Sequence, residues 1–229
     1  MLRKLSVATI TMQLLKKGVR MASMNGVRPL NKPTKSIVGP AFTLRFIPGR
    51  EDLSSPETLA QPDYAPRVAI EKVPKGAILV IDGRGQSNLA VLGDIIIERL
   101  KFRRIGGLVT DGGIRDLEEC LRADFPIYAC GPAAPASITG HAGGDTQCAI
   151  GCGGVAVIPN DIIVGDGDGV AVIPAHLASQ VAKDGFEQEN FETFAKLQIK
   201  KGAPLIGTYP PDKHTKTAYE QWVHAEKKD

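Results

Sequence analysis

Three short apolar segments of the 229-residue chain most constrain its fold. AILVID at 77–82, GGLVT at 106–110 and FPIYA at 125–129 lack polar alternation, which is typical of strands buried on both faces. Two expected helices separate them, one from about Asn88 to Lys101 and one at 116–124. A strand–helix–strand–helix–strand series favours parallel pairing, so the sequence predicts an α/β fold.

The rest of the chain adds elements at both ends without a repeat or a linker, so we expect a single domain. It would span 1–229, with a core at about 4–200 and a C-terminal extension at about 201–229. The other expected elements are a helix at 4–17, a strand at 36–47, a surface loop at 48–66, a compact β-meander of three strands (154–158, 161–165 and 169–174, the last two linked by the turn Asp166–Gly169), a helix at 175–201 and a short helix at 218–225.

Composition excludes several functional classes. The net charge is +3, and the basic cluster formed by Lys101, Arg103 and Arg104 is short and lacks aromatic stacking partners, so we expect no nucleic-acid partner. No apolar run approaches the roughly 20 residues of a membrane span, so we expect no membrane association. The four cysteines form no CxxC pair and indicate reduced thiols in a cytoplasmic protein.

The chemically most informative stretch joins a helix start to a strand end. Gly93 would begin a helix, where free backbone N–H groups can bind a carboxylate. Asp111, Arg115 and Asp116 follow the GGLVT strand, at the end of a parallel sheet where ligands bind. A carboxylate that holds a hard divalent cation, beside an arginine that stabilises an oxyanion, is what an enolate requires.

Simpler roles compete for the same residues. Asp116 could cap the helix that follows it, Asp111 could belong to a turn, and Arg115 could form a surface ion pair. His141 could act as a base, although the sequence offers it no nucleophile partner. The residues alone leave these alternatives open.

The combined motifs nevertheless resemble one family. Gly93-Asp94, the run GGLVTDGGIRD at 106–116, Phe125-Pro126 and DGDGVAVIP at 166–174 occur in the order seen in the 4-hydroxy-4-methyl-2-oxoglutarate / 4-carboxy-4-hydroxy-2-oxoadipate aldolase superfamily. That superfamily also contains the regulator of ribonuclease activity A. The resemblance extends over roughly residues 4–211. Asp94 stands where we expect a glutamate in the aldolases, which affects the substrate more than the chemistry.

The resemblance implies a fold, an assembly and a site. The fold is an αββα sandwich of the swivelling-domain type, and the assembly is a homotrimer or homohexamer with sites between subunits. Asp116 matches the metal-binding aspartate, and Arg115 matches the arginine that polarises the keto oxygen. The backbone of Gly93, Asp94, Ile95 and Ile96 matches the loop that holds the pyruvate carboxylate. A glutamate from a neighbouring subunit's late helix has the candidates Glu187, Glu189 and Glu192.

The implied function is that of a class II aldolase or decarboxylase that depends on Mg²⁺ or Mn²⁺. It would cleave a small 2-oxo acid, either a short 4-hydroxy-2-oxo acid or oxaloacetate, and release pyruvate. The alternative is a non-catalytic protein that binds and regulates a ribonuclease. A methyltransferase function is disfavoured, because no strand is followed by a GxGxG-type loop for a methyl-donor nucleotide.

Overall fold

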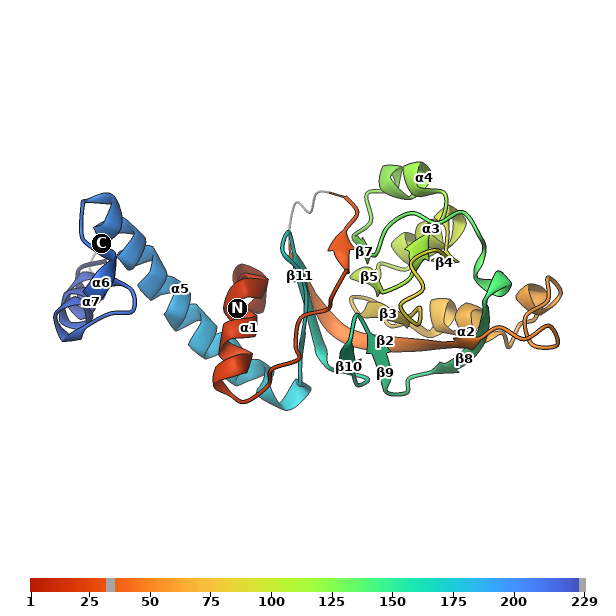
Figure 1. The fold of residues 1–229 in the computed structure, drawn as a ribbon, viewed down its shortest axis with the longest axis horizontal. Helices are drawn as coiled ribbons and strands as arrows, with labels where there is room; N and C mark the ends of the chain where they lie inside the picture. The colour runs from red at the N-terminus through yellow and green to blue at the C-terminus, as the bar shows by residue number, and fades with distance from the viewer. Residues whose placement is uncertain (32–35, 227–229) are drawn as a thin grey trace.

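A computed structural model of the chain describes residues 1–31 and 36–226 as a mixed α/β domain (Figure 1). Its large sheet has the strand order β1-β7-β5-β3-β2-β11-β12, and β8 also pairs with β2. The strands of this sheet are β1 (Arg28–Pro29), β2 (Ile37–Pro48), β3 (Ile78–Asp82), β5 (Gly107–Thr110), β7 (Ile127–Ala129), β8 (His141–Thr146), β11 (Ile162–Asp166) and β12 (Gly169–Ile173). Two smaller pairs are β4 (Ala90–Leu92) with β6 (Gly113–Ile114) and β9 (Ile150–Cys152) with β10 (Val155–Val157).

Most of the helices lie on two sides of these strands. They are α1 (Val7–Lys16), α2 (Ala65–Lys72), α3 (Asp94–Phe102), α4 (Leu117–Arg122), α5 (Ala178–Lys200), α6 (Leu205–Thr208) and α7 (Lys213–Glu226), with the 3-10 turns η1 (Leu2–Lys4), η2 (Thr58–Ala60), η3 (Ser137–Thr139) and η4 (Ala175–Leu177). No helix in the described residues is long and apolar enough to cross a membrane.

The parallel pairing predicted from the apolar segments is confirmed. β3 lies between β2 and β5, β7 follows β5, and all three pairings are parallel. Leu79 and Ile81 pack beneath α2, α3 and α4, whereas Ile78 and Val80 face the core that β9–β12 complete. Because both faces of β3 are covered, its first four residues are apolar and buried, and the polar Asp82 stands only at the last, half-buried position of the strand.

A second helical layer covers the antiparallel end of the sheet. Ile163 and Val172 face the inner core, while Val164 and Ile173 pack against α1 and α5. The Ser6 hydroxyl caps α1 by accepting from the Thr9 N–H at 3.1 Å. From one side of the domain to the other, the layers are therefore helices α2–α4, strands β2, β3, β5 and β7, strands β9–β12, and helices α1 and α5. This is the expected αββα sandwich.

The second half of α5 leaves this body and carries α6 and α7 on a projecting arm (Figure 1). Aromatic rings hold the arm together, with the Phe191 and Tyr219 centroids 5.3 Å apart in an edge-on contact. Phe194 packs between Tyr219 and Trp222. Residues 201–226, which fall within the extension expected from the sequence, form the outer part of this arm.

Two predicted elements are wrong, for identifiable reasons. Residues 90–92 form β4 instead of the first turn of a helix, because their backbone pairs with β6 and with Pro135. β10 pairs with β9 instead of joining a meander with β11, because Gly153 and Gly154 adopt positive φ values of 57° and 77°. That conformation makes a tight two-residue hairpin turn. The predicted β11–β12 hairpin is confirmed.

The expected surface loop at 48–66 also contains more structure than its composition indicates. It includes η2, and its last two residues begin α2. Pro66 stands in the first turn of α2, where a proline costs no helical hydrogen bond. This helix and η2 form one wall of the main cavity described below.

His141 is fully buried at the start of β8, so its protonation is tied to folding. Its ring stacks on Phe46 with the centroids 5.0 Å apart, and Arg84 Nη1 lies 3.3 Å from Nδ1. Nε2 has no hydrogen-bond partner among the described residues. Burial, and then the charge of Arg84, lower the pKa of His141, although Asp111 opposes them. The folded protein therefore favours the neutral ring.

This burial predicts a loss of stability in acid. Below the unfolded-state pKa of about 6.5 the unfolded chain binds a proton that the fold resists, so the free energy of unfolding decreases as the pH falls from 7 to 5. His141→Phe should reduce that decrease in urea unfolding, whereas His214→Gln, at an exposed position, should not. Identical pH slopes for the wild type and His141→Phe would contradict the prediction.

Candidate functional site

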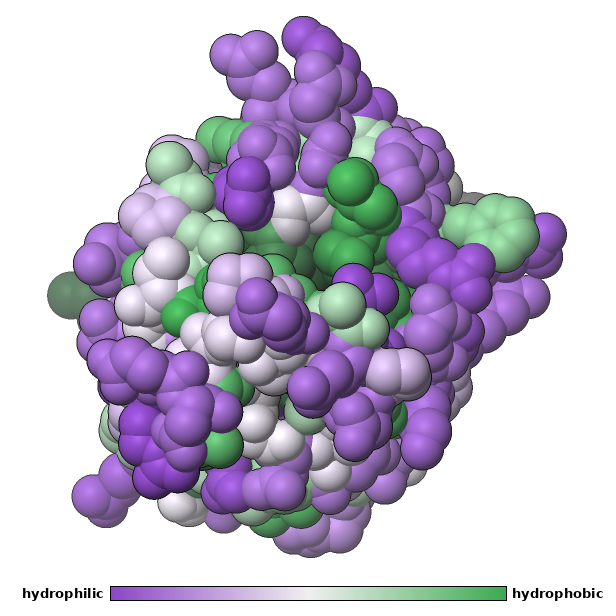
Figure 2. Space-filling model, turned by 90° about the vertical axis from the view of Figure 1, so that its right-hand side faces the viewer, coloured by the Kyte–Doolittle hydropathy of each residue, from purple (hydrophilic) through white to green (hydrophobic). Residues whose placement is uncertain are grey.

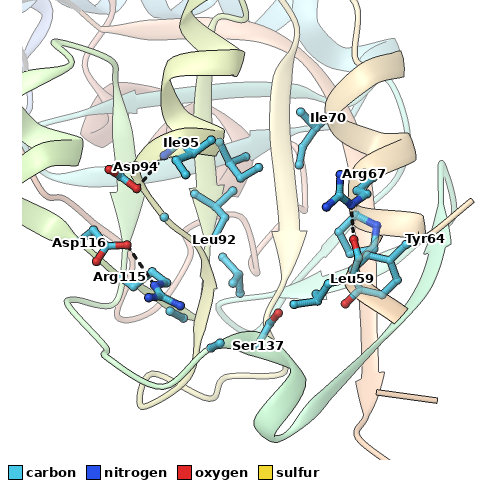
Figure 3. Close-up of a pocket in the computed structure, with 16 residues that line it drawn as sticks. Leu59, Tyr64, Arg67, Ile70, Leu92, Asp94, Ile95, Arg115, Asp116 and Ser137 are labelled. Carbon is cyan, nitrogen blue, oxygen red and sulfur yellow. Dashed lines mark hydrogen bonds and ion pairs between the residues drawn. The ribbon is translucent and has the colours of Figure 1, made fainter. Parts of the chain in front are cut away.

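A cavity of about 520 Å³ opens beside the β4–α3 and β6–α4 junctions. These junctions form one wall, η2 and α2 form the opposite wall, and η3 lies between them (Figure 3). Figure 2 shows this side of the molecule, where an apolar recess is surrounded by hydrophilic side chains. The lining residues are Leu59, Tyr64, Pro66, Arg67, Ile70, Ala90, Val91, Leu92, Gly93, Asp94, Ile95, Ile96, Arg115, Asp116, Ala136 and Ser137.

The first wall exists because β4 and β6 are parallel. Leu92 pairs with Ile114, and the Arg115 N–H donates to the Leu92 carbonyl at 3.1 Å. The residues that follow each strand, Gly93 and Arg115, are therefore brought side by side. A Cβ on Gly93 would lie 2.7 Å from Arg115 Cγ and 2.8 Å from Asp116 Oδ2. Only glycine allows this approach.

The helix start predicted at Gly93 is confirmed, since Gly93 is the N-cap of α3. Its carbonyl accepts from the N–H groups of Ile96 and Ile97, and the Ile95 N–H donates to Asp94 Oδ1 at 2.8 Å. Within the described residues the Asp94 N–H has no acceptor, as expected for the first turn of a helix. This N–H group and the positive end of the helix dipole are available to an anion.

Asp116 occupies the N-cap position of α4 but does not cap it through its side chain. The structure therefore does not support the alternative in which Asp116 caps the helix. The backbone of Asp116 is left-handed, with φ at 53°, and its Oδ2 accepts from Arg115 Nε at 3.0 Å. The two side chains are 45% and 43% exposed, so solvent screens this ion pair and it contributes little to stability. It orients both groups at the cavity.

The carboxylates at this wall suit a hard divalent cation. Burial raises the pKa of the Cys120 thiol to about 11, and the negative charges of Asp94 and Asp116 add to this effect. Both carboxylates therefore lie near Cys120. The described residues contain no group of three or more His, Cys, Asp and Glu side chains that could hold a metal. Mg²⁺ is usually bound by one or two carboxylates with waters and substrate oxygens, so the donors present suit it.

Asp111 has a different position from the one its sequence context suggested. It is buried, and its carboxylate accepts from the N–H groups of Gly83, Gly85 and Gly153 at 2.7, 3.2 and 3.1 Å. It therefore ties together the loop after β3 and the β9–β10 turn. It does not line the cavity with Arg115 and Asp116.

The candidate glutamates of α5 are not brought to this cavity within one chain. Glu189 Oε1 accepts from the Ser6 N–H at 2.8 Å, and Glu192 Oε1 accepts from Gln188 Nε2 at 2.8 Å. Glu187 is exposed on the same helix. Figure 1 places α5 at the end of the molecule opposite α2. A contribution from these residues would have to come from another copy of the chain.

The opposite wall of the cavity was not predicted from the sequence. Tyr64, Arg67 and Ile70 come from α2 and the residue before it, and Ser137 comes from η3. The Tyr64 hydroxyl is buried without a hydrogen-bond partner among the described residues. The Pro66 helix-start signal would have located α2, but nothing in the sequence places it across from Arg115.

Comparison with known proteins identifies the family. A family model described as Aldolase/RraA matches residues 7–172. The chain belongs to the RraA-like family. A putative 4-hydroxy-4-methyl-2-oxoglutarate aldolase of Halalkalibacterium halodurans is 36% identical over 184 residues, which cover 80% of each chain.

Solved structures agree with this membership. RraAS2 of Streptomyces coelicolor, described as an unusual member of the RNase ES inhibitor RraA protein family, superposes with a TM-score of 0.75 at 29% identity. The match covers 85% of this chain and 92% of RraAS2. A protein from Geobacillus kaustophilus described as a 2-dimethylmenaquinone methyltransferase has a TM-score of 0.53 at 24% identity, over 74% and 97% of the two chains, and shows only a shared fold. The RraA-like family thus includes both aldolase and regulator names.

The close contact at Gly93 gives a structural prediction. Gly93→Ala has no backbone strain to overcome, because φ is −137°, but its methyl group must displace Arg115 and Asp116. We expect a crystal structure of the variant to show both side chains moved, and urea unfolding to show a loss of about 1–3 kcal/mol. Gly167→Ala, with open space around its Cβ, should change stability by no more than about 0.5 kcal/mol. Unmoved side chains in Gly93→Ala would contradict this.

Proposed function

We propose that this protein is a carbon–carbon lyase that depends on Mg²⁺ or Mn²⁺ and releases pyruvate from a small 2-oxo acid. The observation that carries the proposal is the close approach of three groups at one cavity wall: the α3 N-terminus at Gly93, the Arg115 side chain and the Asp116 carboxylate. An anion site, an oxyanion donor and a hard-metal ligand are the groups that an enolate-forming reaction needs. The similarity to a putative aldolase supports the same reaction class.

Each of these groups has a physical task. The backbone at Gly93–Ile96 binds the substrate carboxylate, because the α3 N-terminus offers an N–H group and a partial positive charge. Arg115 donates to the keto oxygen, and its charge stabilises the enolate oxygen more strongly than the neutral ketone. Asp116, with Asp94 beside it, would hold the divalent ion, which when bound supplies Lewis-acid polarisation of the keto oxygen.

Cleavage of the C3–C4 bond then moves negative charge onto the keto oxygen at this wall. The C3–C4 bond breaks, its electron pair forms the enolate double bond, and the keto oxygen takes the negative charge. In an aldol cleavage the C4 hydroxyl loses a proton as it becomes a carbonyl, and pyruvate forms when C3 is protonated. Oxaloacetate loses CO₂ through the same enolate, so one site can support both reactions.

We propose a homotrimer or homohexamer in which a glutamate of α5 from a neighbouring copy completes the site, since the described residues of one chain supply only two carboxylates, Asp94 and Asp116, at the cavity wall. All four cysteines are free in the structure, which supports a cytoplasmic location.

A regulator that binds a ribonuclease is the alternative, and the similarity to RraAS2 supports it. Such a protein would need a surface that recognises its partner but no cavity with oriented charges. The oriented Arg115–Asp116 pair therefore favours the enzyme.

The deciding experiment measures pyruvate formation. In a coupled assay we expect release from oxaloacetate and from 4-hydroxy-2-oxo acids, loss of activity with EDTA, and recovery with Mg²⁺ or Mn²⁺ because the site offers oxygen ligands. No pyruvate from any of these substrates would reject the lyase function. Full activity after exhaustive chelation would reject the metal dependence.

The Arg115 side chain separates an electrostatic role in catalysis from a surface ion pair. Arg115→Ala should lower kcat by about two to three orders of magnitude, roughly 2.7–4 kcal/mol, because it removes an oxyanion donor. Its cost in unfolding free energy should be about 0–1 kcal/mol. Arg122→Ala, which removes a similar exposed ion pair on α4, is the matched control and should leave kcat unchanged. Equal kcat values for both variants would return Arg115 to a structural role.

A further inference from the structure

The arm formed by the second half of α5 with α6 and α7 exposes a stripe of side chains that the proposed reaction does not use. Phe186, Asn190, Thr193 and Leu197 follow one another along α5 at intervals of four, three and four residues, so they share one face of the helix. Phe186 is 38% exposed and Leu197 is 40% exposed. We call these four residues the α5 seam. Large apolar side chains at both of its ends indicate a surface that packs on another helix.

The arm has only a small interior of its own. It extends away from the sheets, and aromatic rings between α5 and α7 hold it together (Figure 1). Three of these rings, those of Phe191, Tyr219 and Trp222, stay half-buried. Helices in proteins owe most of their stability to tertiary packing of one apolar face, so a two-helix arm is stabilised when a further helical surface covers it.

The charges along α5 show which surface fits the seam. Residues 187–192 include three glutamates and no basic residue, whereas residues 196–201 include three lysines and no acidic residue. The helix is therefore negative toward the body and positive toward the tip of the arm. An identical helix laid antiparallel brings each negative half beside a positive half, whereas a parallel one brings like charges together. The charge pattern therefore fits a second copy of α5 in the antiparallel direction.

The seam is also self-complementary in this arrangement. With a twofold axis between positions 191 and 192, Phe186 lies opposite Leu197 of the second copy, and Asn190 lies opposite Thr193 of the second copy. Apolar pairs then close both ends of the contact, and polar pairs occupy its centre. A contact of a twofold dimer requires such a self-complementary surface, and polar residues within an apolar seam fix its register.

We propose that the α5 seam binds the same seam of a second copy of this chain, antiparallel and around a twofold axis. Glu192 lies on a different face of α5, where its carboxylate accepts from Gln188 and Tyr209. The seam contact can therefore coexist with the contact between neighbouring copies proposed above. Threefold contacts at the cavity together with twofold contacts between arms form a hexamer. The seam contact itself does not depend on lyase activity.

Light scattering after size-exclusion chromatography tests the contact with a matched pair of variants. Leu197→Glu places a charge within the seam, so we expect it to halve the molar mass found for the wild type at micromolar concentration. Ile199→Glu is the control, because Ile199 is also 40% exposed on α5 but lies about 160° around the helix axis from Leu197. It should leave the mass unchanged. Circular dichroism checks that both variants melt like the wild type.

Cysteine crosslinking tests the direction and the register. Asn190→Cys and Thr193→Cys chains, co-expressed and mildly oxidised, should form a disulfide-linked dimer, because the proposed register places the two positions opposite each other. Either variant alone should give much less of this dimer, and the wild type, whose four free cysteines lie outside the arm, should give none through α5. Both changes replace small polar side chains, so this measurement decides the question even if Leu197→Glu unfolds.

Each outcome supports or overturns the seam contact. A wild type with an odd number of chains, or a folded Leu197→Glu variant with the wild-type mass, overturns it. An equal fall in mass for Leu197→Glu and Ile199→Glu also overturns it, because the effect would not belong to the seam. Crosslinking of each cysteine variant with itself, without the mixed dimer, overturns the antiparallel register. A halved mass and a mixed dimer support the contact, whether or not the protein releases pyruvate.

Discussion

The contact of Gly93 with Arg115 and Asp116 is the constraint on which the site depends. It arises from the short parallel pair β4–β6, which ends both strands at the same level and joins them to the starts of α3 and α4. Because Gly93 has no Cβ, a helix N-terminus and an arginine–aspartate pair can occupy neighbouring positions. Any side chain at that position would separate the anion site from the oxyanion donor.

The large sheet holds this contact in place from behind. β3 and β5 are buried on both faces, so the junctions that follow them begin from fixed positions. The Asp111 carboxylate accepts hydrogen bonds from three backbone N–H groups and so joins the loops after β3 and between β9 and β10. The polar side chains at the cavity are therefore attached to a rigid sheet. This keeps their charges aligned, as electrostatic stabilisation of an enolate needs.

The cavity has two ends with different chemistry, and the arm lies away from both. Carboxylates and Arg115 mark the wall where a keto acid would react, whereas Arg67 and Tyr64 line the opposite wall. Ile95 is 79% exposed at the edge of the first wall, and α5 carries its glutamates at the other end of the molecule. Both features are consistent with a site that a second copy of the chain completes.

The sequence alone determined the parallel centre of the sheet, the helix start at Gly93 and the pairing of Arg115 with Asp116 in one motif. These features depend on local signals: continuous apolar runs, a glycine before a helix, and adjacent residues. Tertiary structure decided the rest. β4 is a strand because β6 and Pro135 satisfy its backbone, and Asp116 turns to Arg115 instead of capping α4. α2 becomes the opposite wall only because the chain returns across the cavity, and contacts between residues distant in sequence leave no periodic pattern from which that position could be predicted.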